Sequence, residues 1–286
     1  MRSLGPGSHV FVPDGVSEEA ALGRTTHLAI GAHPDDVPLM AQHGILECFA
    51  SEDRWFTAVT VTDGAGSPRS AAYADHTDVE MRQVRAQEEA KAAVIGEYSA
   101  AVLLGHSSGA VKTAPATEIV EELAELVTVS RPDVVYTHNP ADKHDTHVAV
   151  ALRTIDALRL VPESHRPAAV YGCEVWRDLD WLPDTDKVIF DVSPRQNLAR
   201  ALMGVYDSQV SGGKRYDLAV AGRRLAHATF SASHEVDSAE ALTYAIDLTP
   251  LIHDPGLDLA TFVVDHLTRL AREISTRITT LEGGDG

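Results

Sequence analysis

Short apolar runs alternate with helical patterns over the first two-thirds of the chain. Four of these runs predict buried strands, at residues 27–31, 55–62, 100–104 and 133–138. The segments between them predict helices over residues 35–50, 79–95 and 116–130. Strands that alternate with helices favour an α/β fold, with a Rossmann-like, mostly parallel sheet and helices on both faces.

The pattern becomes less regular beyond residue 168. It predicts short strands at residues 169–171 and 187–192, and helices near residues 195–206 and 216–228. A last amphipathic helix is predicted over residues 259–278. We therefore expect a single domain over residues 1–286, with its core at about 25–230 and a C-terminal helical extension at about 231–286. The extension is a candidate cap or contact in a homo-oligomer, although amphipathic helices more often pack into a core.

Composition narrows the classes of partner. Hydrophobic residues make up 44% and charged residues 23% of the 286 residues, which is typical of a folded globular protein. No apolar run reaches the roughly 18 residues of a membrane helix. The formal net charge of −18 argues against nucleic acid and anionic lipid, which bind basic surfaces. We therefore expect a small-molecule substrate, with neither nucleic acid nor a membrane as partner.

The two cysteines, Cys48 and Cys173, are too few and too far apart for a disulfide framework or a Cys-rich metal site. The first 15 residues lack the apolar core of a signal peptide. These observations predict a cytoplasmic protein.

Ligands of open α/β sheets bind beyond the carboxyl ends of the strands. The segments to inspect are therefore residues 32–36, 62–67 and 138–147. The first has the sequence Ala32-His33-Pro34-Asp35-Asp36. A proline and carboxylates are common at a helix start, but a histidine at the positive end of the helix dipole is not explained by that preference. His33 and Asp36 can project to one side of the helix start, and they are ligand types of a hydrolytic zinc site.

The third segment holds three histidines and two aspartates within ten residues: His138, Asp142, His144, Asp145 and His147. Histidines beside carboxylates at a second strand end are candidate ligands or acid–base groups. His33, Asp36 and one of His144 or His147 would supply three ligands, leaving the fourth position of a tetrahedral site for water. Asp35 could accept a proton from that water.

These segments resemble motifs of the LmbE-like/PIG-L superfamily of zinc-dependent N-deacetylases. Residues 32–36 resemble its AHPDD signature, and residues 142–147 resemble its D-x-H-P-D-H motif. The loop at residues 62–67 is similar to its T-D-G-x-x-G-S loop, and the helix around Arg85 and Glu88 to its R-x-x-E helix. The resemblance covers about residues 25–230 and implies the LmbE-like deacetylase fold.

The resemblance implies a role for each matching residue. The ligands of one Zn²⁺ per chain would be His33, Asp36 and His147. Asp35 would be the general base and His144 the second catalytic group. Apart from the resemblance, Arg85 and Asp63 are candidate contacts to the substrate, with a solvated helix face as the alternative for Arg85.

Three positions depart from the family pattern. Val37 replaces a frequent Glu, and Asp145-Thr146 replaces Pro-Asp, so the partner of His144 must come from elsewhere. Asp142 stands where one subgroup has a Tyr near the oxyanion, so the oxyanion-stabilising residue stays unassigned.

The resemblance implies a hydrolase that removes an acetyl or related acyl group from an amide nitrogen, in an N-acetylated amino sugar or a metabolite that contains one. An amidase of a thiol conjugate or natural product is an alternative within the same family. A non-catalytic, metal-containing binding protein is an alternative of another class. A nucleotide-binding dehydrogenase is disfavoured, because a proline and two acids replace the Gly-rich turn after the first strand.

Overall fold

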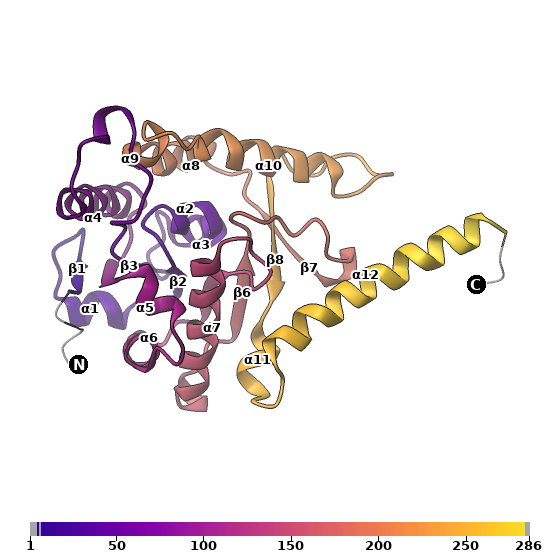
Figure 1. Ribbon diagram of the computed structural model, residues 1–286, viewed down its shortest axis with the longest axis horizontal. Coiled ribbons are helices and arrows are strands. Elements are labelled where there is room, and N and C mark those ends of the chain that lie inside the picture. Colours follow the sequence, from indigo (N-terminus) through magenta and orange to yellow (C-terminus); the bar gives the residue numbers. More distant parts are fainter. Residues whose placement is uncertain (1–4, 6, 284–286) are drawn as a thin grey trace.

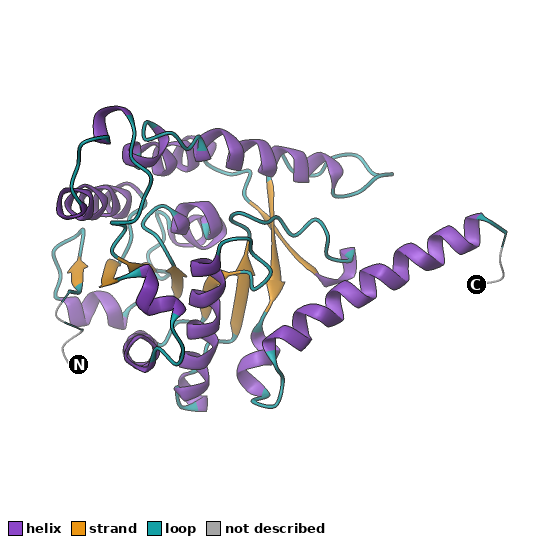
Figure 2. Ribbon diagram, viewed as in Figure 1, coloured by secondary structure: helices purple, strands orange, loops and turns teal. Residues whose placement is uncertain are grey.

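The computed structural model describes residue 5 and residues 7–283, which form one α/β unit around a single sheet (Figures 1 and 2). The strand order is β1-β4-β3-β2-β5-β6-β8-β7. The strands in chain order are β1 (His9–Phe11), β2 (His27–Gly31), β3 (Phe56–Thr62), β4 (Ala100–His106), β5 (Val134–His138), β6 (Ala169–Cys173), β7 (Lys187–Asp191) and β8 (Leu242–Asp247).

The five central strands are parallel, and the two edges are antiparallel. In the centre, His27 of β2 lies opposite Phe56 of β3 on one side and Val134 of β5 on the other. All residues of β2 and β3 are buried, as expected for parallel strands covered on both faces. This burial explains why these strands appear in the sequence as continuous runs rather than as alternating patterns.

Helices cover both faces of the sheet. The described helices are α1 (Glu18–Gly23), α2 (Asp36–Met40), α3 (Gln42–Cys48), α4 (Asp78–Ile95), α5 (Ser108–Lys112), α6 (Thr117–Ser130), α7 (Asp145–Leu160), α8 (Gln196–Gly204), α9 (Asp207–Val210), α10 (Tyr216–Phe230), α11 (Thr249–His253) and α12 (Leu259–Leu281). Short 3₁₀ turns are η1 (Ala71–Tyr73), η2 (Glu163–His165) and η3 (Asp184–Asp186). One hydrophobic core packs α1, α6, α7 and α11 against the sheet, and a second packs α2, α3, α4 and α8 against the opposite face.

The predicted α/β class and mostly parallel sheet are confirmed, and two local predictions differ. The helix expected over residues 35–50 is interrupted at Ala41, whose φ of −110° and ψ of 26° leave the helical range. The region beyond residue 230, expected to be a helical extension, contains β8. This strand pairs with both β6 and β7, so the sheet extends past the predicted core boundary.

The last helix, α12, packs against the core only near its start, through the partly buried Leu259 and Phe262, and the expectation of core packing fails for the rest of the helix. It runs away from the body of the molecule toward the C-terminus (Figure 1). His266 is its one buried residue, whereas the apolar side chains of Leu267 and Ile278 are 46% and 52% exposed. Among the described helices, none combines the length and apolarity needed to cross a bilayer.

Candidate active site

Three loops meet at the carboxyl ends of β3, β2 and β5, which are neighbours in the parallel part of the sheet. Residues after each strand line one cavity of about 410 Å³. His33, Asp35 and Asp36 follow β2. Gly64, Gly66, Ser67 and Pro68 come from the β3 loop, and His144, Thr146 and His147 from the start of α7. The sheet topology thus brings the three predicted segments together, as expected for this fold class.

Three donor atoms converge at the floor of the cavity. The His33 Nδ1 atom lies 3.1 Å from Asp36 Oδ2 and 3.2 Å from His147 Nε2. The His147 Nε2 atom lies 3.4 Å from the same Asp36 oxygen. Ligands at about 2.0–2.1 Å from a tetrahedral ion are separated by about 3.3–3.4 Å. The spacing and the donor types therefore fit one metal ion held by these three side chains.

Local hydrogen bonds explain how the β2 loop presents two of these ligands. Asp36 Oδ2 accepts a hydrogen bond from the backbone N–H of His33 at 2.7 Å, which folds the turn and places both side chains on one side. Gly31, the last residue of β2, lies close behind this turn. A Cβ atom there would lie 3.3 Å from Cβ of Asp36 and 3.2 Å from Cγ2 of Val37.

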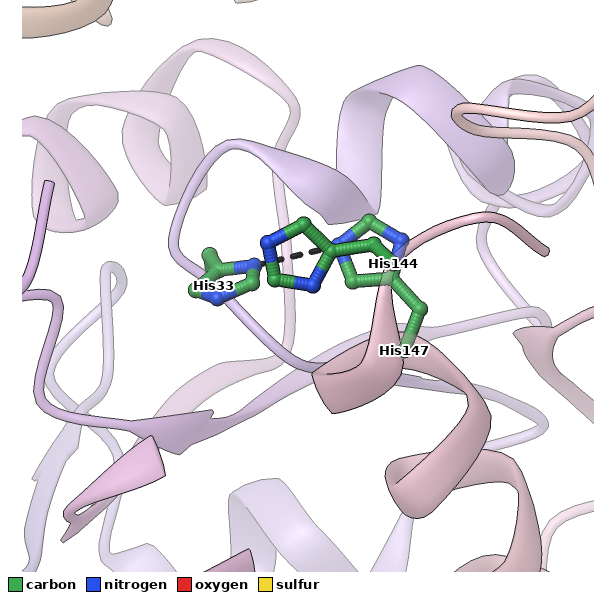
Figure 3. Close-up of side chains that lie close together, drawn as sticks. All are labelled: His33, His144 and His147. Carbon is green, nitrogen blue, oxygen red and sulfur yellow. Dashed lines mark hydrogen bonds between the residues drawn. The ribbon is translucent and has the colours of Figure 1, made fainter. Parts of the chain in front are cut away.

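The two other residues of the histidine cluster begin α7. Figure 3 shows His144 and His147 converging on His33, with the hydrogen bond between His33 and His147 dashed. His144 is the N-cap of α7, and its Nδ1 accepts a hydrogen bond from the N–H of Thr146 at 3.3 Å. The neutral His144 ring therefore carries its proton on Nε2. A donor atom of His144 also lies within 4.8 Å of donors from His33 and His147, so it borders the metal position.

The pKa values of Asp36 and His147, at the floor of the cavity, depend on burial and on the charges of their neighbours. Burial alone would raise the pKa of Asp36, but His147, His33 and His138 hold it well below its usual range. Burial would lower the pKa of His147, but the Asp36 and Asp142 carboxylates outweigh this effect and raise it. Asp36 is therefore ionised, as a metal ligand must be.

His138 lies behind the ligand set. Its ring stacks on His147 at a centroid distance of 4.0 Å, and its Nε2 accepts a hydrogen bond from the N–H of Ala32 at 2.9 Å. Burial and the neighbouring His147 lower the pKa of His138 to about 4, so the ring is neutral. Its Nε2 is also 3.4 Å from Asp36 Oδ2, but the lone pair is already used by Ala32. His138 therefore packs behind the site, and the candidate ligands are His33, Asp36 and His147.

Asp35 and Arg85 form a buried pair in the wall of the same cavity. The Nη2 atom of Arg85 donates to Asp35 Oδ1 at 2.5 Å, and Nη1 donates to Ser208 Oγ at 3.3 Å. Glu88 completes the network by accepting from the N–H and the hydroxyl of Ser208, each at 2.7 Å. The guanidinium of Arg85, expected from the sequence to contact substrate, is thus engaged with Asp35 and Ser208.

Asp63, the other residue expected to contact substrate, lies elsewhere. It lines a separate cavity with Arg82, whose Nε donates to Asp63 Oδ2 at 2.7 Å. Its Oδ1 accepts from the N–H of Ala65 at 3.1 Å. These bonds give Asp63 a role in ordering the loop after β3.

The rim of the cavity contains residues that the sequence did not indicate. They come from α5, from the segment after β6, from α9 and from the entry into α10, namely Lys112, Val175, Trp176, Gln209, Lys214 and Tyr216. None of them belongs to a recognisable motif, and only tertiary packing brings them to the cavity.

The comparison with known proteins agrees with this geometry. Residues 28–158 match the family described as "PIG-L: GlcNAc-PI de-N-acetylase". This segment of 131 of the 286 residues is similar to the PIG-L family. The PIG-L segment runs from β2 to α7 and contains every candidate ligand and both candidate catalytic residues. No curated protein matches the sequence.

Solved structures share the fold at low sequence identity. The conserved protein TT1542 from Thermus thermophilus has a TM-score of 0.63 and 19% identity, over 82% of this chain and 99% of that one. The N,N'-diacetylchitobiose deacetylase from Pyrococcus horikoshii has a TM-score of 0.62 and 14% identity, over 80% and 86%. GalB, a 4-carboxy-2-hydroxymuconate hydratase from Pseudomonas putida KT2440, has a TM-score of 0.61 and 17% identity, over 78% and 96%. The fold that these structures share with this chain is therefore found with more than one reaction.

Proposed function

We propose that this protein is a zinc-dependent hydrolase that removes an acetyl or related acyl group from the amide nitrogen of an N-acetylated amino sugar, or of a metabolite that contains one. The observation that carries the proposal is the convergence of His33, Asp36 and His147, with donor atoms 3.1–3.4 Å apart, in a cavity that also contains Asp35. The PIG-L match and the diacetylchitobiose deacetylase among the structural neighbours support it.

His33, Asp36 and His147 would hold one zinc ion per chain, since two imidazoles and a carboxylate are a ligand set of catalytic zinc sites. A zinc ion bound there would polarise the acyl carbonyl and lower the pKa of a bound water from 15.7 to about 7.

Asp35 would act as the general base. Its Oδ1 is held by Arg85, while its Oδ2 accepts no hydrogen bond from the part of the chain that the structure describes. That oxygen takes a proton from the water whose oxygen attacks the acyl carbon. As the C–N bond breaks, Asp35 returns the proton to the leaving nitrogen, which yields a carboxylic acid and a free amine. Arg85 acts through Asp35 as a positioning residue.

His144 is placed to stabilise the oxyanion of the tetrahedral stage. Because its Nδ1 accepts from Thr146, the neutral ring presents an N–H donor at Nε2. The residue lines the cavity next to the ligand set, where such a donor can meet the developing negative charge.

The proposal is tested by metal analysis combined with an amine-release assay on acetylated amino sugars and thiol conjugates, with and without chelator. Zinc-loaded protein should release amine, and chelator should abolish it. His147→Ala should lose both metal and activity, whereas His253→Ala, at an exposed position in α11, should retain both. Chelator-insensitive hydrolysis would exclude the zinc mechanism. Zinc-loaded protein that releases no amine from any compound would favour the non-catalytic binding protein.

A further inference from the structure

The rim of the cavity is cationic in a strongly acidic chain. The sequence has five lysines and a net charge of −18, yet two of those lysines, Lys112 and Lys214, line this one cavity. The carboxylates that line it are Asp35 and Asp36, both at the floor and both engaged by Arg85 or by the histidines. Apart from these two engaged carboxylates, the described lining gives the lysines no acidic neighbour.

Neither lysine has a carboxylate partner that would explain its position. Within the residues that the structure describes, neither Lys112 nor Lys214 forms an ion pair with a carboxylate. Lys187 shows the contrasting arrangement, since its ammonium lies 2.7 Å from Asp184 and 3.7 Å from Asp180. The two rim lysines gain no comparable stabilisation from the protein, so their charges are available to a ligand.

An aromatic surface adjoins the lysines. The Lys214 Nζ atom lies 4.9 Å from the ring centroid of Trp176, and Tyr216 meets the same ring edge-on at 6.0 Å. The backbone N–H of Trp176 donates to Asp142 Oδ2 at 3.0 Å, which fixes this loop relative to His147. Trp176 also faces His144 at a centroid distance of 6.2 Å. The aromatic ring therefore spans from the candidate oxyanion donor toward the cationic rim.

We infer that the substrate carries an anionic group, a carboxylate or a phosphate, remote from the scissile amide. Lys112 and Lys214 bind this group while Trp176 supports the body of the substrate. The inference rests on the proposed function for the reacting end of the substrate. Its physical basis is separate. A neutral substrate can only accept hydrogen bonds from the two ammonium groups, whereas an anion is also attracted by their charge and is repelled by the acidic chain elsewhere.

The test compares anionic and neutral acetylated sugars. N-acetylmuramic acid supplies the carboxylate, N-acetylglucosamine 1-phosphate supplies the phosphate, and N-acetylglucosamine is the neutral reference. We expect kcat/KM to be higher for one of the anionic compounds, mainly through a lower KM, and this preference to shrink as NaCl is raised. Lys112→Gln and Lys214→Gln should each reduce the anionic-to-neutral ratio of kcat/KM about tenfold. Lys112→Arg and Lys214→Arg, which keep the positive charge, should retain most of the wild-type anionic-to-neutral ratio.

Lys91→Gln, at an exposed position in α4, is the matched control and should leave the ratio unchanged. Equal use of neutral and anionic compounds, or a ratio unaffected by both lysine variants, would overturn the inference while leaving the proposed function intact.

A binding measurement distinguishes failure of the anion-site inference from failure of the proposed hydrolase function. If no compound releases amine, calorimetric titration of the zinc-loaded protein with the same three compounds decides. Tighter binding of an anionic compound, weakened by Lys112→Gln and Lys214→Gln, would support the anion site although deacetylation had failed. Equal binding of anionic and neutral compounds, or equally absent binding, would overturn it.

Discussion

The carboxylate of Asp142 lies 3.5 Å from Nδ1 of His147, whose other ring nitrogen faces His33 and Asp36. The same Asp142 oxygen accepts the N–H of Trp176, and its partner oxygen accepts the N–H of His144 at 3.1 Å. One side chain thus orients a candidate ligand, the start of α7 and the aromatic rim. Carboxylates in this position fix the tautomer of a ligating histidine and raise its basicity.

Asp142→Asn should lower metal affinity by about 10–100-fold without unfolding the protein, because the amide keeps the size of the carboxylate but loses its charge. Competition with a zinc indicator measures the affinity. Excess zinc should restore a large part of the activity. Asp145→Asn, at an exposed neighbouring position, is the control. Wild-type affinity in Asp142→Asn would show that the contact does not tune the site.

Asp35→Asn should reduce kcat by about 10²–10⁴-fold while leaving the metal content unchanged. Asparagine can still accept the hydrogen bond from Arg85, so the buried guanidinium keeps a partner and the variant isolates the loss of the base. Turnover and metal analysis on the same preparation provide the measurement. Activity near that of the wild type would contradict the assignment of Asp35 as general base.

Glu89 makes the stability of the fold depend on pH. It is fully buried in α4 and accepts a hydrogen bond from the Tyr206 hydroxyl at 3.1 Å, and burial raises its pKa to about 8 from 4.5. The unfolded chain ionises near pH 4.5 while the folded protein keeps the proton, so stability falls as pH rises from about 4.5 to about 8. Glu89→Gln should raise Tm at pH 8 and change it little at pH 5.

Thermal melts of Glu89→Gln and wild type across this range measure the effect. Glu121→Gln, at an exposed position in α6, is the control. The same Tm difference at both pH values would indicate a packing effect in place of a buried ionisation.

Glu174 connects three parts of the second half of the chain. Its Oε1 accepts from the N–H of Leu179 at 2.6 Å and lies 3.0 Å from Nε2 of His227, and its Oε2 accepts from the N–H of Tyr244 in β8 at 3.0 Å. Glu174→Ala would leave these buried donors unpaired and should cost about 3–5 kcal/mol of unfolding free energy. Urea denaturation measures this loss.

Glu174→Gln keeps the size and one acceptor oxygen, so it should cost less than the alanine variant. Glu163→Ala, at an exposed position in η2, should have little effect. Equal small effects of both substitutions at position 174 would show that β8 is held by packing alone.

Features that depend only on residues close together along the chain could be predicted from the sequence. The buried runs at β2, β3 and β5 predicted the parallel strands, because strands covered on both faces must be apolar throughout. The position of His33 and Asp36 after one strand, and of His144 and His147 after another, predicted one shared site. The ends of parallel strands meet at one edge of the sheet, so the topology follows from the alternation of elements.

The tertiary structure decided what depends on contacts between distant segments. The sequence left His144 and His147 as alternative ligands. Their positions come from the tertiary structure, in which Nε2 of His147 lies 3.2 Å from His33 Nδ1 and 3.4 Å from Asp36 Oδ2, while Nδ1 of His144 accepts from Thr146. Arg85 and Asp35 are 50 positions apart, and their pairing requires α4 to pack beside the β2 loop. The insertion of β8, the exposure of α12 and the cationic rim have the same origin. Each is set by how whole elements pack on the sheet, and local periodicity contains no information about those partners.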